Sequence, residues 1–267
     1  LLVYETFVMM LLKKIILSVV NNDDINKSLS IIGMHPFFYP KVKEVEAQSK
    51  KDMPISHIMA TLTTVADTGH IVSGGSLGEY SWFMQMYDLS LKQIVTLCLN
   101  RLMYMLINGN PYGEMMNIEE ISDYFSKSEL FTPNQLKIVL VGIKKYYEED
   151  YISALHILVP QFESFLLSIA KQLGISTVAL DTTVDTATRT KVLSERDFDS
   201  EDFIKIFGED FCRQIKFVLF EPMGYKLRHK IAHGEIAPAE CNFQNTTLVL
   251  YLYFVILGRV GIKKSKD

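Results

Sequence analysis

The feature that most constrains the fold is a set of long apolar segments that begin at good helix-capping residues. Threonine suits the cap and proline the first helical position, so Thr132 and Pro133 predict the start of one helix. A second helix is predicted over Tyr151–Leu173, with Pro160 inside it. Asn242 caps a final apolar helix that runs to about residue 260. Because such segments recur along the chain, the sequence predicts a mostly helical protein.

Neither of the two most apolar runs is predicted to cross a membrane. The run Phe7–Val20 is interrupted by Lys13 and Lys14, and the run Leu248–Leu257 has only about half of the roughly 20 apolar residues that a spanning helix needs. Both runs are therefore interpreted as buried helices. The chain of 267 residues is 48% hydrophobic and 22% charged, which is typical of a globular protein with a sizeable core.

The net charge and the cysteine content indicate which binding partners and which cellular compartment are expected. A net charge of -4 argues against a protein that coats nucleic acid non-specifically, although it is compatible with a local basic site. The three cysteines, Cys98, Cys212 and Cys241, are widely spaced and form no CxxC pair, so no cysteine-based zinc site is expected. Sparse cysteines in odd number suit free thiols in a reducing cytoplasm, which is the predicted location.

One segment of the N-terminal part differs from the helical remainder. Residues 58–72 are rich in threonine and valine and are interrupted by Asp67-Thr68-Gly69, a pattern that predicts a small β-hairpin. The predicted organisation is a mostly helical N-terminal region over residues 1–130, which carries this hairpin, and a helical domain over residues 131–267.

The segment KLRHKIAHGE in the C-terminal part contains the best candidates for chemistry. Arg228 and His233 are five positions apart, so they lie roughly 140° apart around an ideal helix and would flank a groove. His229 and His233 are four positions apart and share a face. Lys226 and Lys230 add positive charge, which predicts that a polyanion binds here despite the acidic whole.

These residue types suit RNA cleavage without a metal ion or another cofactor. In that reaction a base removes the proton of the ribose 2′-hydroxyl, which attacks the neighbouring phosphate, and an acid protonates the leaving 5′-oxygen. An arginine such as Arg228 stabilises the excess negative charge, and a histidine such as His233 transfers protons near neutral pH. Two copies of the helix that face each other across a two-fold axis would supply paired groups.

Three other interpretations of the same residues stay open at this point. Arg228 and Lys230 can be solvated charges on a surface helix. His229 and His233 can be half of a zinc site, although the HExxH glutamate is absent and Glu235 lies past the predicted end of the helix. His233 can also cap the helix C-terminus, where an imidazolium is favoured.

Two stretches resemble known sequences. The spacing of Arg228 and His233 is similar to the R-x(4–6)-H motif of the HEPN superfamily (higher eukaryotes and prokaryotes nucleotide-binding domain). Residues 154–163, ALHILVPQFE, resemble the "ALHLLVPQLE" helix of a bacterial family with a HEPN-like C-terminal module. Residues 221–234, EPMGYKLRHKIAHG, are similar to its "DPxGxNLRNxxAHG" signature. Lys226 and His229 stand where that family commonly has asparagine, and Leu167 where it often has arginine.

The resemblance implies an all-α helical bundle, a homodimer that brings two motif helices together, and metal-independent cleavage of RNA. It also implies that Glu163, on the earlier helix, helps to orient the site. On residue pattern alone Glu163 is the one acid on an apolar stripe, but it is also a favourable first-turn acid if the helix restarts at Pro160.

The leading hypothesis is therefore a cytoplasmic, homodimeric endoribonuclease that acts in phage defence or a stress response, with RNA and a regulatory or antitoxin protein as partners. Arg228, His233, His229 and Glu163 are the predicted catalytic set, and Lys226 and Lys230 are predicted to bind the substrate. The alternatives are a non-catalytic module that binds RNA or a nucleotide, and a dimeric interaction scaffold.

Overall fold

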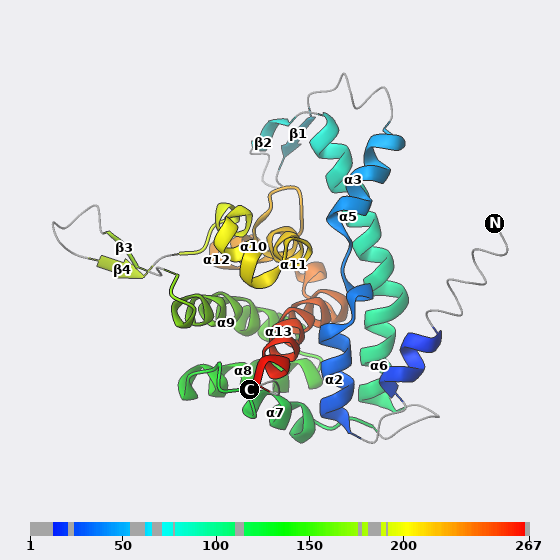
Figure 1. Cartoon of the computed structure of the whole chain (residues 1–267), viewed down its shortest axis with the longest axis vertical. Coiled ribbons are helices and arrows are strands. Elements are labelled where there is room, and N and C mark those ends of the chain that lie inside the picture. Colours follow the sequence, from blue (N-terminus) through cyan, green and yellow to red (C-terminus); the bar gives the residue numbers. More distant parts are fainter. Residues whose placement is uncertain are drawn as a thin grey trace. The chain divides into compact units, whose positions relative to one another are not determined.

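A computed structural model describes residues 13–20, 24–53, 62–65, 71–76, 78–109, 115–175, 178–180, 188–190 and 192–264. The described part is mostly helical, which confirms the predicted all-α class (Figure 1). The α-helices are α2 (Ile25–Met34), α3 (Val42–Lys51), α5 (Gly78–Ile94), α6 (Asn100–Asn108), α7 (Ile118–Ser126), α8 (Pro133–Tyr147), α9 (Tyr151–Gln172), α10 (Glu201–Phe207), α11 (Glu209–Ile215), α12 (Leu227–His233) and α13 (Phe243–Lys264).

Shorter elements connect these helices. Two π-helical turns, η2 (Val95–Leu99) and η4 (Lys216–Phe220), continue α5 and α11, and three 3-10 turns are η1 (Pro36–Phe38), η3 (Glu195–Asp199) and η5 (Pro238–Glu240).

The described residues also contain two antiparallel strand pairs. Strand β1 (Leu62–Val65) pairs with β2 (Ile71–Ser76), and β3 (Val178–Leu180) pairs with β4 (Thr188–Thr190). The predicted hairpin covered residues 58–72, whereas β2 continues to residue 76. The predicted turn at residues 67–69 lies outside the described residues.

The chain groups into two compact units, and each unit is discontinuous in sequence. The first unit contains residues 1–38, 91–158 and 237–267, and the second contains residues 39–90 and 159–236. These units do not follow the predicted division at residue 130, because each draws segments from both sides of it. Local patterns identify helices but carry little information about which distant helices pack together.

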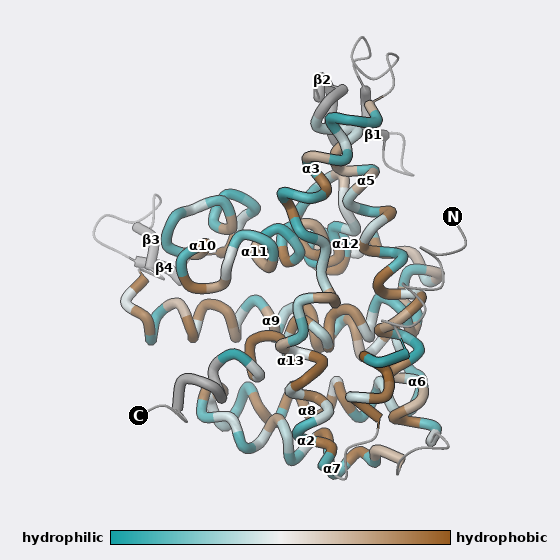
Figure 2. Tube along the Cα trace, turned by 45° about the vertical axis from the view of Figure 1, so that its right-hand side comes forward, coloured by the Kyte–Doolittle hydropathy of each residue, from teal (hydrophilic) through white to brown (hydrophobic). Residues whose placement is uncertain are grey.

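Helix α13 is the centre of the first unit. Its residues 246–258 are all buried, as expected for a helix that is apolar on every side (Figure 2). A Cβ atom on Gly33 of α2 would lie 2.0 Å from the carbonyl oxygen of Phe254, so only glycine permits this close backbone approach. The buried hydroxyls of Tyr146 and Thr247 are 2.6 Å apart and satisfy each other. The prediction of a buried helix over Leu248–Leu257 is confirmed.

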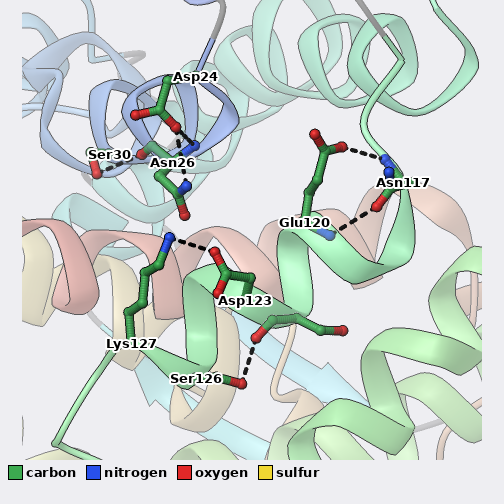
Figure 3. Close-up of polar contacts among 9 residues, drawn as sticks. Asp24, Asn26, Ser30, Asn117, Glu120, Asp123, Ser126 and Lys127 are labelled. Atoms are coloured by element: carbon green, nitrogen blue, oxygen red, sulfur yellow. Dashed lines mark hydrogen bonds and ion pairs between the residues drawn. The ribbon is translucent and has the colours of Figure 1, made fainter.

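Helix starts in this unit follow the capping rules that the sequence indicated. The Thr132 hydroxyl accepts from the Gln135 N–H while the Gln135 side chain accepts from the Thr132 N–H, with Pro133 at the first helical position. Asn117 and Glu120 form the same reciprocal arrangement at the start of α7 (Figure 3). The Asn242 side chain accepts from the Asn245 N–H at the start of α13. The predicted caps at Thr132 and Asn242 are therefore confirmed.

Helix α9 passes through both units and matches its predicted range to within one residue. It stays helical through Pro160, and Gly174 follows it at φ 82°, a conformation that suits glycine. Among the described residues, α9 alone is long and apolar enough to cross a membrane by length and composition. Its buried positions recur every three or four residues, which is the pattern of a helix that packs one face on a protein core.

Candidate functional site

The segment that precedes α12 is held against η4 within the second unit. The Tyr225 N–H donates to the carbonyl oxygen of Phe217 at 3.0 Å, and a Cβ atom on Gly224 would lie 2.1 Å from that same oxygen. Leu227, the first residue of α12, is fully buried. This backbone contact therefore requires glycine at position 224 and fixes the start of the candidate helix.

A buried carboxylate anchors the other end of the same turn. Glu221 is 5% exposed and accepts a hydrogen bond from the Tyr80 hydroxyl at 2.7 Å. Lys216 Nζ lies 4.0 Å from Glu221 Oε2 and donates to Asp199 Oδ2 at 2.6 Å. Burial and the Glu221 carboxylate raise the pKa of Tyr80, so its hydroxyl stays protonated and continues to donate.

Lys226 occupies an unusual backbone conformation at the start of α12. Its φ of 54° and ψ of 31° lie in the left-handed region, where side chains other than glycine, asparagine and aspartate are strained. Asparagine enters this region more readily than lysine does. The lysine therefore adds charge beside the histidines at a conformational cost.

Glu163 and Arg228, which are 65 positions apart, contact each other directly. Arg228 Nε donates to Glu163 Oε2 at 2.9 Å, and Nη2 lies 3.5 Å from Oε1. Glu163 Oε1 also accepts from the Leu193 N–H at 3.1 Å, which holds the carboxylate in place. The side chains of Arg228 and Glu163 are 25% and 14% exposed, so the pair is partly shielded from water. These bonds use two of the five guanidinium donors.

The two histidines of α12 contact each other. The ring centroids of His229 and His233 are 4.3 Å apart, and the rings are inclined at 43°. His229 Nε2 is 3.8 Å from Glu235 Oε2. Burial, then Lys226 and His233, lower the pKa of His229, so this ring is largely neutral at pH 7 and can accept a proton.

The end of α12 determines where Glu235 lies. Gly234 adopts φ 68°, and the Glu235 N–H donates back to the Lys230 carbonyl at 2.7 Å, which closes the last turn. The Glu235 side chain is thereby brought back toward His229, six residues earlier.

Four of the six predicted site residues thus fall into two contacting pairs. Glu163 and Arg228 form one, and His229 and His233 form the other, while Lys226 precedes the histidines in sequence and Lys230 lies between them. The two groups make their hydrogen bonds and ring contacts separately, which agrees with the wide angle expected between Arg228 and His233. Among the residues described, no group of three His, Cys, Asp or Glu is arranged to hold a metal ion.

The supporting contacts of Leu193, Tyr80 and Lys216 were not anticipated. The first acts through its backbone, which leaves no signal in sequence, and the other two have no motif around them.

Comparisons with known protein families, with curated proteins and with solved structures find no match for this chain.

Proposed function

We propose that this chain is a metal-independent endoribonuclease of the HEPN type. The observation that carries the proposal is the fixed Arg228 guanidinium, held by Glu163, on the same two-turn helix as a pair of contacting histidines. A phosphate-binding cation and proton-transfer groups are the parts that cleavage by a 2′-hydroxyl requires.

Each residue has a role that follows from its position. Arg228 binds the scissile phosphate with the donors that Glu163 leaves available, and Glu163 orients the guanidinium. His233, which is exposed at the end of α12, transfers protons to and from the reacting oxygens. His229, whose lowered pKa favours the neutral ring, shares that transfer or positions the ribose. Lys226 and Lys230 attract the RNA backbone.

The reaction needs no group beyond these. The 2′-oxygen forms a bond to phosphorus as its proton passes to a base, and the bond from phosphorus to the 5′-oxygen breaks as an acid protonates that oxygen. The products are a 2′,3′-cyclic phosphate and a free 5′-hydroxyl. Because one α12 offers few groups, the proposal includes a homodimer in which two copies of α12 face each other over the RNA.

A mixed RNA pool in EDTA tests this function. Wild type is expected to leave 2′,3′-cyclic phosphate ends, and His233→Ala and Arg228→Ala are expected to lose cleavage while they keep the helical circular dichroism of wild type. His156→Ala is the matched control, because His156 is an exposed histidine whose ring contacts the Ile152 carbonyl of its own helix and none of the candidate site residues. Cleavage that persists in both site variants would overturn the proposal.

The ion pair also favours one alternative. Glu163 takes the Nε donor of Arg228 and offsets its charge, which suits a structural arginine in a module that binds RNA without cutting it. Salt-sensitive RNA binding that Arg228→Ala weakens, with no cleavage by wild type, would identify this binding module. A dimer that neither binds nor cleaves RNA would identify a scaffold. The biological setting that we propose, phage defence or stress response in the cytoplasm, rests on the resemblance.

A further inference from the structure

We propose that residues 193–199 form a positioning segment for the candidate site, and that Asp197 controls the position of the Arg228 guanidinium through the conformation of this segment. The segment lies between β4 and α10 in the chain and belongs to the same compact unit as α12. Its structural role stands on hydrogen bonds alone, whereas its effect on cleavage rests on the proposed function.

One end of the segment holds the carboxylate that binds Arg228. The Leu193 N–H donates to Glu163 Oε1 at 3.1 Å, while Glu163 Oε2 accepts from Arg228 Nε at 2.9 Å. A glutamate side chain has several rotatable bonds, so a backbone donor on one oxygen selects one orientation from many. The Leu193 side chain is 3% exposed, which fixes that donor against the core. The position of the Arg228 guanidinium therefore depends on the backbone at residue 193.

Asp197 fixes the backbone directly after Leu193. Its Oδ2 accepts from the Ser194 N–H at 2.8 Å and from the Ser194 hydroxyl at 2.9 Å, and its own N–H donates to the Ser194 carbonyl at 3.2 Å. The Ser200 hydroxyl donates to the Asp197 carbonyl at 2.6 Å, which holds the other end of the turn. Asp197 is 9% exposed, and hydrogen bonds to a shielded carboxylate are stronger than those between neutral groups. Loss of this carboxylate is thus expected to loosen the segment without removing any group from the site.

The other end of the segment contacts the elements that precede α12. Asp199 accepts from Lys216 Nζ at 2.6 Å, and the same nitrogen lies 4.0 Å from the buried Glu221 carboxylate. The Phe198 ring is buried, and its centroid lies 5.1 Å from that of Phe220. Lys216 and Phe220 belong to η4, which leads into the turn before α12. The segment thus contacts both supports of the candidate helix, the carboxylate on α9 and η4.

This arrangement makes Asp197 a positioning residue for the proposed reaction. A guanidinium stabilises the transition state only when its donors point at the phosphate, and a displacement of about 1 Å can lower a rate roughly 100-fold. Attraction of the RNA backbone depends on the charges of Lys226, Arg228 and Lys230, which a loosened segment leaves unchanged. Removing the Asp197 carboxylate should therefore lower kcat and leave KM nearly unchanged.

The exchange of the Arg228 Nε–H proton with water tests the structural role in the absence of RNA. Its NMR resonance is assigned by its loss in Arg228→Lys. Asp197→Ala should exchange this proton about tenfold faster than wild type, because two hydrogen bonds that limit local opening are lost. Asp197→Asn should restore most of the protection, because its amide oxygen still accepts from Ser194. Ser194→Ala, which loses only the hydroxyl bond, should lie between wild type and Asp197→Ala.

Glu120→Ala is the matched control. It removes an equivalent bond between a side-chain carboxylate and a backbone N–H, at the start of α7 in the other compact unit, and the exchange of the Arg228 proton should not change. A wild-type exchange rate in an Asp197→Ala variant that keeps its helical circular dichroism would overturn the positioning role. If that variant unfolds, a wild-type rate in Ser194→Ala would overturn it.

Steady-state cleavage of RNA in EDTA tests the effect on the reaction. The kcat of Asp197→Ala should be roughly 10- to 100-fold below that of wild type with KM within about twofold, and Asp197→Asn should recover most of the rate. Faster proton exchange in Asp197→Ala, with no cleavage by wild type, would refute the proposed function and leave the positioning role intact. Faster exchange with an unchanged kcat would refute control of the reaction by this segment, while the proposed function stands.

Discussion

Gly224→Ala gives the sharpest structural test of how the candidate helix is held. The added Cβ atom would lie 2.1 Å from the Phe217 carbonyl oxygen, well inside the normal contact distance, and the obstacle is backbone that cannot rotate away. The turn must therefore move by about 1 Å, which costs roughly 1–3 kcal/mol for overpacking. That movement also disrupts the hydrogen bond from the Tyr225 N–H to the same oxygen, a further loss of about 1 kcal/mol. The expected decrease in the free energy of unfolding is roughly 2–4 kcal/mol.

Urea unfolding monitored by circular dichroism measures this decrease, and Gly174→Ala is the matched control. Gly174 belongs to the same unit and has φ 82°, and a Cβ atom added there would meet no other atom within 4 Å, so alanine carries only the conformational penalty of about 1 kcal/mol. Gly224→Ala should be clearly the less stable variant. It should also reduce any RNA cleavage, because it displaces the turn that leads into α12, the helix that carries Arg228, His229 and His233. Equal stability of the two variants would show that the turn does not pack on Phe217 as described.

Three further predictions concern the site residues. Lys226→Asn should stabilise the chain by about 0.5–1 kcal/mol in urea unfolding, because asparagine tolerates the left-handed conformation better; a destabilised variant would contradict the strain at this position. A double-mutant cycle of Glu163→Gln and Arg228→Gln should give a coupling energy of roughly 1–2 kcal/mol, above that of a surface pair, and additive effects would show that the pair contributes nothing. Because the pKa of His229 is lowered on folding, the unfolded chain binds the proton more readily, so His229 destabilises the fold as pH falls below about 6.5. Wild type should therefore lose more stability than His229→Gln between about pH 7.5 and about pH 5.5, and identical losses would argue against the lowered pKa.

Local chemistry determined which parts of the fold were predictable. The starts of α8 and α13 were predicted correctly because Thr132 and Asn242 form caps with residues only three positions away. The C-terminal end of α9 was nearly correct because Gly174 terminates the helix locally. The grouping of the chain into two interleaved units was not predicted, since it depends on packing between segments far apart in sequence, such as Gly33 of α2 on Phe254 of α13.

The candidate site shows the same limit. The spacing of His229 and His233 predicted their contact, because residues four apart on a helix are neighbours. Glu163 was singled out by the resemblance and as the one acid on an apolar stripe, and its partner Arg228 supplies a physical reason for that position. The left-handed conformation of Lys226 could not be read from the sequence, because lysine rarely adopts it and tertiary contacts impose it.

Cleavage of RNA in EDTA by wild type, beside His233→Ala, Arg228→Ala and the His156→Ala control, tests the central claim most directly. The proposed function predicts 2′,3′-cyclic phosphate ends from wild type and the control, and none from the two site variants. Cleavage that disappears in EDTA, or that survives in both site variants, would contradict it.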